Sequence, residues 1–237
     1  MNRLHSLQFW AAFPLLLPQA LWVRRTALRL PPALGPRHGI VNVGGRPLRL
    51  FALGDSIVAG VGIEELFDAM PGRLVSALFK HTGRPIHWRA LDRNGANCAE
   101  LRQALLDEPG DPADIVFVSV GVNDVTGLRT QRTWQRDVRA LLAALVQHSQ
   151  QARIVLAAIP PLDVFPALPS PLRQLLGRRS RQLNAITERV VREFPNVVFL
   201  PTPVPDDPTM FASDGFHPNS RACSVWAEAV IQAALVR

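Results

Sequence analysis

The sequence predicts an α/β domain built on a parallel sheet of about five strands, with helices on both faces. From Leu48 onward, short apolar runs alternate with amphipathic segments, which is the order expected of strands joined by crossover helices. The central run, Asp114–Val120, is apolar and β-branched almost throughout, as in a strand that is covered on both faces. A chain of 237 residues suits one core of this kind with a short appendage.

Each predicted strand leads into a helix. The strand at Leu48–Leu53 precedes a helix at Pro71–His81, where a proline near the start suits the first helical turn. The same alternation continues along the chain, with strands at Ile86–Leu91, Asp114–Val120, Ile154–Ile159 and Val197–Leu200, and helices at Ala99–Leu106, Thr133–His148, Leu172–Phe194 and Asn219–Val236. The arginines of the longest helix are expected mostly on its solvent side; they are Arg178, Arg179, Arg181, Arg189 and Arg192.

Residues 1–47 are expected to form an apolar, arginine-rich arm and linker ahead of a domain at 48–237. The run Leu7–Val23 is marginal for crossing a bilayer and is interrupted by two prolines. Aromatic residues beside Arg24 and Arg25 suit a segment lying on an anionic membrane face, and an arm folded over the domain explains the run equally well. Export is disfavoured, because arginines follow the run and no clear small-residue cleavage site appears. The charge order favours a cytoplasmic location, with or without attachment to the inner membrane face.

The excess of basic over acidic residues lies entirely in the N-terminal part of the chain. The formal net charge is +7, yet residues 1–50 hold seven arginines and no acidic residue, so the rest of the chain is balanced at 19 basic and 19 acidic residues. A charge-balanced domain argues against nucleic-acid binding, which usually relies on an excess of basic residues. The charge therefore points to the arm and its contacts, and nucleic acid is not an expected partner.

The two cysteines give no sign of a metal site. Cys98 and Cys223 lie far apart in the sequence and lack the close Cys/His spacing of zinc ligands. We expect two small, mostly buried thiols. Neither a metal-ligand set nor a cofactor motif appears elsewhere, so the predicted chemistry needs neither.

Polar turns that contain glycine follow three of the predicted strands. They are Gly54-Asp55-Ser56, Asn94-Gly95-Ala96-Asn97 and Gly121-Val122-Asn123-Asp124. A serine directly after a strand can sit in a tight turn with its hydroxyl facing a cavity, although a phosphate-binding loop also fits a glycine-rich turn after a first strand. In parallel sheets, ligands bind at the carboxyl ends of strands, so these turns converge if the strands are neighbours.

Near the C-terminus, Asp214 and His217 are three residues apart, just before the last predicted helix. A serine hydroxyl becomes a good nucleophile when an imidazole takes its proton, and an acid beside that imidazole fixes its orientation. The other histidines lack an acid at this spacing. Asp214 and His217 are therefore candidate partners of Ser56.

With these four blocks in chain order, the sequence resembles the SGNH, or GDSL, hydrolase superfamily over most of Leu48–Arg237. The blocks are GDS with Ser56, NGAN with Gly95, GVND with Asn123 and DGFH with His217. The resemblance implies a three-layer α/β/α, flavodoxin-like domain that hydrolyses esters or thioesters through an acyl-enzyme. Ser56 would attack, His217 would act as base and then as acid, and Asp214 would orient His217. The backbone N–H groups of Ser56 and Gly95 and the side-chain amide of Asn123 would form the oxyanion hole.

The substrate is left more open by the sequence. The loop Pro160–Leu176 has apolar residues that suit a pocket for lipid-like or aryl acyl groups, among them Val164, Phe165 and Leu168, although the loop can equally serve to pack on the core. A sugar or small-ester O-deacetylase is the alternative on the same fold. An alternative of another class is a non-catalytic phosphate- or nucleotide-binding module that uses the Gly54–Gly62 loop.

Overall fold

The computed structural model describes residues 16–42, 44–202 and 207–236. A six-stranded sheet runs through its centre in the order β1-β3-β2-β4-β5-β6. All neighbouring strands are parallel except β1, which pairs antiparallel with β3 at the sheet edge. The strands are β1 His38–Val41, β2 Leu48–Gly54, β3 Ile86–Asp92, β4 Ile115–Ser119, β5 Arg153–Ala157 and β6 Val197–Leu200.

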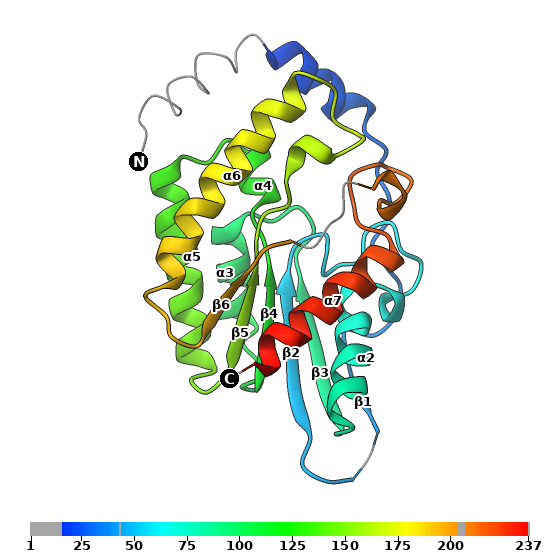
Figure 1. Ribbon diagram of the computed structural model, residues 1–237, viewed down its shortest axis with the longest axis vertical. Helices are drawn as coiled ribbons and strands as arrows, with labels where there is room; N and C mark the ends of the chain where they lie inside the picture. The colour runs from blue at the N-terminus through cyan, green and yellow to red at the C-terminus, as the bar shows by residue number, and fades with distance from the viewer. Residues whose placement is uncertain (1–15, 43, 203–206, 237) are drawn as a thin grey trace.

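Helices cover both faces of this sheet, so the α/β/α prediction is confirmed (Figure 1). Helices α2 and α7 pack together on one face, and α3, α5 and α6 form the layer on the other. The short helix α4 directly follows β4. The helices are α2 Met70–Thr82, α3 Cys98–Asp107, α4 Val122–Thr126, α5 Gln131–His148, α6 Leu172–Val191 and α7 Ser220–Leu235, with short 3₁₀ turns at Leu66–Asp68, Leu162–Val164 and Pro208–Met210.

Local sequence explains where several helices begin. Asn97 caps α3, because its side chain accepts from the backbone of Ala99 and Glu100, and Glu100 bonds back to the Asn97 N–H. Asn219 caps α7 by accepting from the N–H of Ala222. These caps fix helix starts close to the carboxyl ends of the strands, where parallel α/β sheets bind their ligands.

Strand β1 lies within the segment predicted as arm and linker. His38–Val41 pairs with β3 from Val41↔Ile86 to His38↔Arg89, which adds a sixth strand to the five that were predicted. The preceding chain also contacts the domain, since Ala33 is buried and its N–H donates to Ala59 O. Hydrophobic periodicity gave no signal for this strand, because it is short and only half-buried.

Residues 16–26 are helical and lie against the domain beside the start of α6 (Figure 1). Residues 7–15 of the predicted apolar run lie outside the described part of the chain. In the described residues, no helix combines the length and the apolar character needed to cross a membrane. Cys98 and Cys223 are both free and buried, as expected.

Candidate active site

The three polar turns converge because β2 lies between β3 and β4. Gly54 is the register partner of Asp92 in β3 and of Ser119 in β4, so the three strands end side by side. A side chain at Gly54 would clash, since a Cβ there would lie 2.5 Å from Val58 Cγ2 and 2.8 Å from the Ser119 carbonyl oxygen. The close approach of the backbones at this point requires glycine. Ser56 follows two residues later, at the carboxyl end of the central strand β2.

Asp214 and His217 form the pair that their spacing predicted. Nδ1 of His217 lies 2.6 Å from Asp214 Oδ2, and the other carboxylate oxygen accepts from the backbone N–H groups of Phe216 and His217. The Asp214 side chain is only 3% exposed. Burial alone would raise the pKa of Asp214, but the hydrogen bonds from the His217 side chain and from the two backbone N–H groups lower it below its ordinary value. The aspartate is thus held ionised against the ring.

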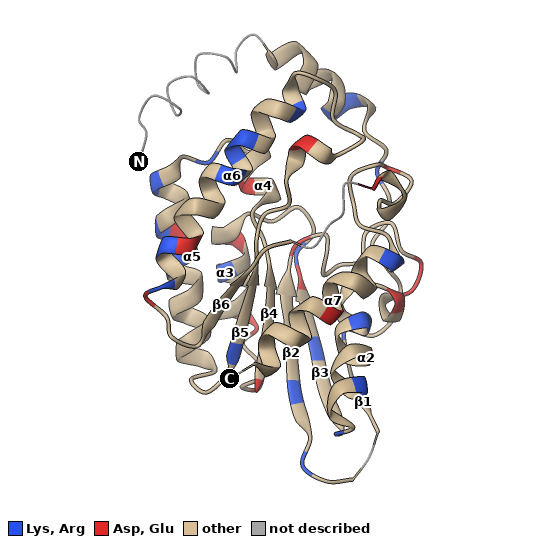
Figure 2. Ribbon diagram, viewed as in Figure 1, with Lys and Arg blue, Asp and Glu red and all other residues tan. Residues whose placement is uncertain are grey.

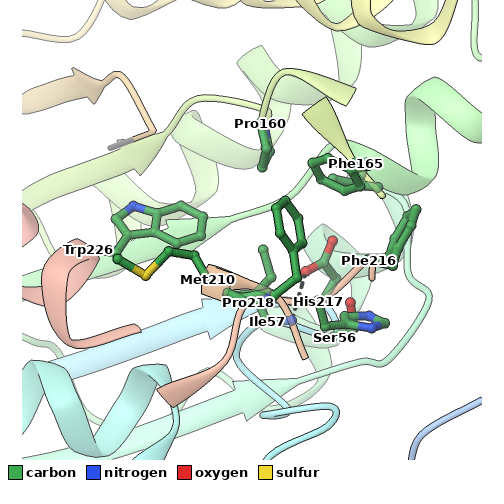
Figure 3. A pocket seen from close by; sticks show the side chains of 12 residues that line it. Ser56, Ile57, Pro160, Phe165, Met210, Phe216, His217, Pro218 and Trp226 are labelled. Atoms are coloured by element: carbon green, nitrogen blue, oxygen red, sulfur yellow. Dashed lines mark hydrogen bonds between the residues drawn. The ribbon is translucent and has the colours of Figure 1, made fainter. Parts of the chain in front are cut away.

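Ser56 and His217 line the same pocket (Figure 3). Ser56 comes from the turn after β2, while His217 comes from the segment before α7, more than 150 residues later. That segment is held in place by an isolated antiparallel bridge between Phe211 and Pro218 and by the Ala167 N–H, which donates to Gly215 O. The structure therefore brings the candidate nucleophile, base and acid to one place.

The backbone N–H groups of Ser56 and Gly95 are free to bind a ligand. Neighbouring N–H groups are occupied, since Asp55 N donates to Ser119 O, Ile57 N to the Asp55 carboxylate, and Ala96 N to Arg93 O. Within the described part of the chain, the N–H groups of Ser56 and Gly95 donate to no protein acceptor. Gly95 is also exposed, in a turn with φ of +80°. Two unoccupied donors at adjacent strand ends suit a developing negative oxygen.

Asn123 contributes its side-chain amide from the first turn of α4. Its Nδ2 group donates to Ala96 O at 3.0 Å and to Asp55 Oδ2 at 3.3 Å. The first bond ties α4 to the turn that holds Gly95, and the second ties it to the turn that holds Ser56. The Asn123 amide thus links the turns that carry Ser56 and Gly95, the two other residues that the resemblance assigned to the oxyanion hole.

Two buried carboxyl groups in the strand-end turns had no role in the sequence prediction, and one of them, Asp55, lines the same pocket as Ser56 and His217. Asp55 and Asp124 are both almost completely buried. Burial is the main cause that raises the pKa of each to about 7, and the charge of Asp124 adds to the effect at Asp55. Asp124 accepts from the Cys98 N–H at 3.0 Å, so it links α4 to α3. The only signal in the sequence was their place beside Ser56 and Asn123.

The pocket itself is apolar and aromatic. Phe165, a candidate substrate-binding residue, lines it together with residues that the sequence did not single out for substrate; these are Asp55, Ile57, Val122, Pro160, Met210, Phe211, Phe216, Pro218 and Trp226. Figure 3 shows Trp226 and Met210 at the far side from Ser56 and His217. The space open to water-sized molecules is about 30 Å³, room for about two waters. Leu168 is buried in the core and Val164 is half-buried against it; neither lines this pocket, so their contact with substrate stays a prediction.

The chain matches known proteins both as a family member and in fold. A model of the GDSL-like lipase/acylhydrolase family matches residues 52–223. No curated protein matches the chain in sequence. Among solved structures, the chain is similar to a psychrotrophic esterase, EstA, from Pseudoalteromonas sp., with a TM-score of 0.57 and 18% identity over 79% of this chain and 96% of that one. A lipase from a goat rumen metagenome gives a TM-score of 0.62 and 17% identity over 80% and 99%. An acetyl xylan esterase from Geobacillus stearothermophilus gives 0.57 and 19% over 81% and 98%.

Proposed function

We propose that this chain, which belongs to the GDSL-like lipase/acylhydrolase family, hydrolyses carboxylic esters through a covalent acyl-enzyme on Ser56. The observation that carries the proposal is the Asp214–His217 pair, 2.6 Å apart, in a segment that lines one pocket with Ser56. Nucleophile, base and orienting acid are the three parts that serine catalysis needs.

The proposed reaction has two halves. His217 Nε2 takes the Ser56 proton while Oγ attacks the ester carbonyl carbon, and the carbonyl electron pair moves onto oxygen. The tetrahedral intermediate then expels the alcohol, which leaves with the proton from His217. A water molecule, activated by the same histidine, attacks the acyl-Ser56 carbonyl and releases the acid, which restores the serine.

The oxyanion of each tetrahedral intermediate would bind the free N–H groups of Ser56 and Gly95 and the amide of Asn123. Both amide hydrogens of Asn123 have acceptors in this structure, and the contact to Asp55, at 3.3 Å, is the longer of the two. We expect the oxyanion to replace Asp55 as acceptor, because an oxyanion in a water-poor site is the stronger partner for an N–H donor.

The lining of the pocket supports an apolar or aryl acyl group. Phe165, Phe216 and Trp226 offer ring surfaces on which an acyl or aryl group is removed from water. The small open volume favours a second candidate, hydrolysis of short acyl esters such as acetates, because a longer chain requires side chains to move aside.

The glycine-rich loop gives no support to a phosphate-binding module. The backbone N–H groups from Ala59 to Ile63 all donate to carbonyl oxygens, including Gly62 to Pro31 and Val61 to Ser56. A phosphate cradle needs such N–H groups unoccupied.

A chain-length series of p-nitrophenyl esters tests the proposal. We expect hydrolysis by the wild-type protein and essentially none by Ser56→Ala, with Ser213→Ala, an exposed serine before Asp214, as the matched control. A rate profile that rises from acetate to longer chains supports the apolar acyl site, and a sharp preference for acetate supports the short-acyl candidate. An unchanged rate in Ser56→Ala would contradict both.

A further inference from the structure

The helix at residues 16–26 has two apolar faces, and among the described residues one of them packs on the domain while the other is exposed. Leu16, Ala20 and Val23 pack on the main core cluster. Between them, Gln19 donates to Ser170 O at 2.8 Å and accepts from the Leu172 N–H at 3.0 Å. These residues share the i, i+3, i+4, i+7 spacing of one helix face. The arm is therefore fixed to the domain through this face.

The opposite face presents large apolar side chains to solvent. Leu17 and Leu21, one turn apart, are each 44% exposed, and Trp22 is 58% exposed. In the described residues, five of the twelve exposed large hydrophobic side chains lie in residues 16–34; they are Leu17, Leu21, Trp22, Leu28 and Leu34. Soluble domains rarely expose several large apolar side chains close together. This cluster on a solvent-exposed face therefore indicates a binding partner.

The charged residues of this segment are all basic. Arg24, Arg25 and Arg29 are all exposed, and residues 16–34 contain no acidic residue. In Figure 2 the ribbon of this segment is coloured blue at Lys and Arg and nowhere red. We refer to Leu17, Leu21, Trp22, Arg24, Arg25 and Arg29 as the N-terminal face.

The segment that carries this face is hydrogen-bonded to two loops that also supply residues to the pocket. Through Gln19 it holds the loop that begins at Pro160 and supplies Phe165 to the pocket. Further along, Ala33 N donates to Ala59 O and Pro31 O accepts from Gly62 N, in the loop that follows Ser56. A surface that bound the N-terminal face would therefore lie next to the segments that frame the pocket.

We propose that the N-terminal face binds the surface of an anionic lipid bilayer. Leucine and tryptophan side chains enter the boundary between headgroups and acyl chains, while neighbouring arginines bind anionic headgroups. Charge decides against a second copy of this chain as the occupant, because two such faces would bring like charges together. Exposed leucines and tryptophan decide against a nucleic acid, whose backbone offers no apolar phase.

One consequence rests on the proposed ester hydrolysis. A protein held on the bilayer by this face would take ester substrates from the lipid surface, because the loops that frame the pocket are bonded to the same segment. Binding itself does not depend on catalysis, so the two can be measured separately.

Co-sedimentation of the full-length Ser56→Ala protein with vesicles tests the binding. We expect binding to phosphatidylcholine vesicles that contain phosphatidylglycerol. The partition coefficient should be at least about tenfold lower with vesicles of phosphatidylcholine alone, since each basic residue near an anionic surface contributes about fivefold. The triple change Leu17→Ser, Leu21→Ser, Trp22→Ser should reduce partitioning about tenfold or more, because buried apolar groups contribute additively. The change Arg24→Gln, Arg25→Gln, Arg29→Gln should do the same on the anionic vesicles.

Matched controls keep the test specific. Phe67→Ser and Leu106→Ser remove exposed apolar side chains elsewhere, and Arg132→Gln, Arg178→Gln, Arg192→Gln removes the same charge from α5, α6 and the residue after α6. The controls should bind like the parent protein, and all variants should keep their circular dichroism spectrum. Equal binding by parent and N-terminal-face variants, or no binding of the parent to anionic vesicles, would overturn the proposal.

The outcome is separate from that of the proposed function. In the wild-type background, the N-terminal-face variants should hydrolyse a water-soluble p-nitrophenyl ester at the parent rate. Vesicle binding without any ester hydrolysis would refute the catalytic proposal and would still support membrane binding by the N-terminal face. Hydrolysis without vesicle binding would refute only the proposal that the N-terminal face binds a bilayer.

Discussion

His217 Nδ1 lies 2.6 Å from Asp214 Oδ2, and the backbone N–H groups of Phe216 and His217 bind the other oxygen of the same carboxylate. The aspartate is therefore the centre of a small turn that fixes the ring in position and direction. In the proposed mechanism, this arrangement would stabilise the imidazolium that forms when Ser56 loses its proton.

Removing the Asp214 charge tests that role. Asp214→Asn keeps the shape of the side chain but no longer stabilises the charged ring, so we expect kcat to fall roughly 10⁴-fold. Steady-state kinetics on a p-nitrophenyl ester measures the loss, with the exposed Asp111→Asn as control. A fall of less than tenfold would show that His217 does not depend on Asp214.

Loss of the Asn123 amide should leave a weak enzyme. Asn123→Ala removes one of three proposed oxyanion donors, which costs on the order of 10²- to 10³-fold in kcat. Thr126→Ala, on the exposed side of the same helix, should keep the wild-type rate. If Asn123→Ala lowered only the free energy of unfolding and left kcat unchanged, the amide would be structural, through its bond to Ala96 O.

The buried carboxyl of Asp124 should make stability depend on pH. Burial raises its pKa to about 7, above the ordinary value near 4, so the folded state holds the proton more tightly than the unfolded state. The contribution of protonated Asp124 to the free energy of unfolding is fully present below pH 4 and is lost as the pH rises through about 7. Asp124→Asn keeps an oxygen for the Cys98 N–H and removes the titration.

We therefore expect the variant to gain stability relative to wild type on going from pH 5 to pH 8, by about 1.4 kcal/mol for each pKa unit of the shift that lies above pH 5. Urea unfolding at both pH values measures the difference. The exposed Asp107→Asn should show no such change. A difference between variant and wild type that is the same at both pH values would mean that Asp124 is ionised in the fold.

Opening the pocket should change the acyl preference. Phe216 packs edge-to-face on Phe165 with ring centroids 5.0 Å apart, and both rings line the pocket. Phe216→Ala should raise the ratio of octanoate to acetate hydrolysis about tenfold or more, because each added methylene gains apolar contact in the enlarged space. Phe67→Ala, which removes an exposed ring, should leave the ratio unchanged. An unaltered profile in Phe216→Ala would place the acyl site elsewhere.

The parts of the fold that periodicity could predict are those with a continuous buried face. Strands β2, β3, β4, β5 and β6 and helices α2, α3, α5, α6 and α7 lie within a few residues of their predicted bounds. Strand β1 escaped prediction because an edge strand of four residues has no buried run. Arg179 also differs from expectation, since it is buried in α6 and donates to Arg129 O, whereas the pattern placed it mostly toward solvent.

The candidate catalytic residues could be proposed from the sequence because each lies in a short motif with its own chemistry. The pocket was not, because its walls come from segments far apart in the chain. Trp226 lies in α7 and Phe211 and Phe216 lie before it, while Pro160 follows β5. Only the folded chain shows that these side chains line one pocket with Ser56.

Labelling with a fluorophosphonate probe tests the central claim most directly. A fluorophosphonate reacts with a serine only when a neighbouring base takes its proton and an oxyanion site holds the phosphonyl oxygen. Mass spectrometry of the digested wild-type protein should find the adduct on Ser56, and Ser56→Ala should remain unlabelled. An unlabelled Ser56 in a folded wild-type protein, or an adduct on another serine that persists in Ser56→Ala, would contradict the account.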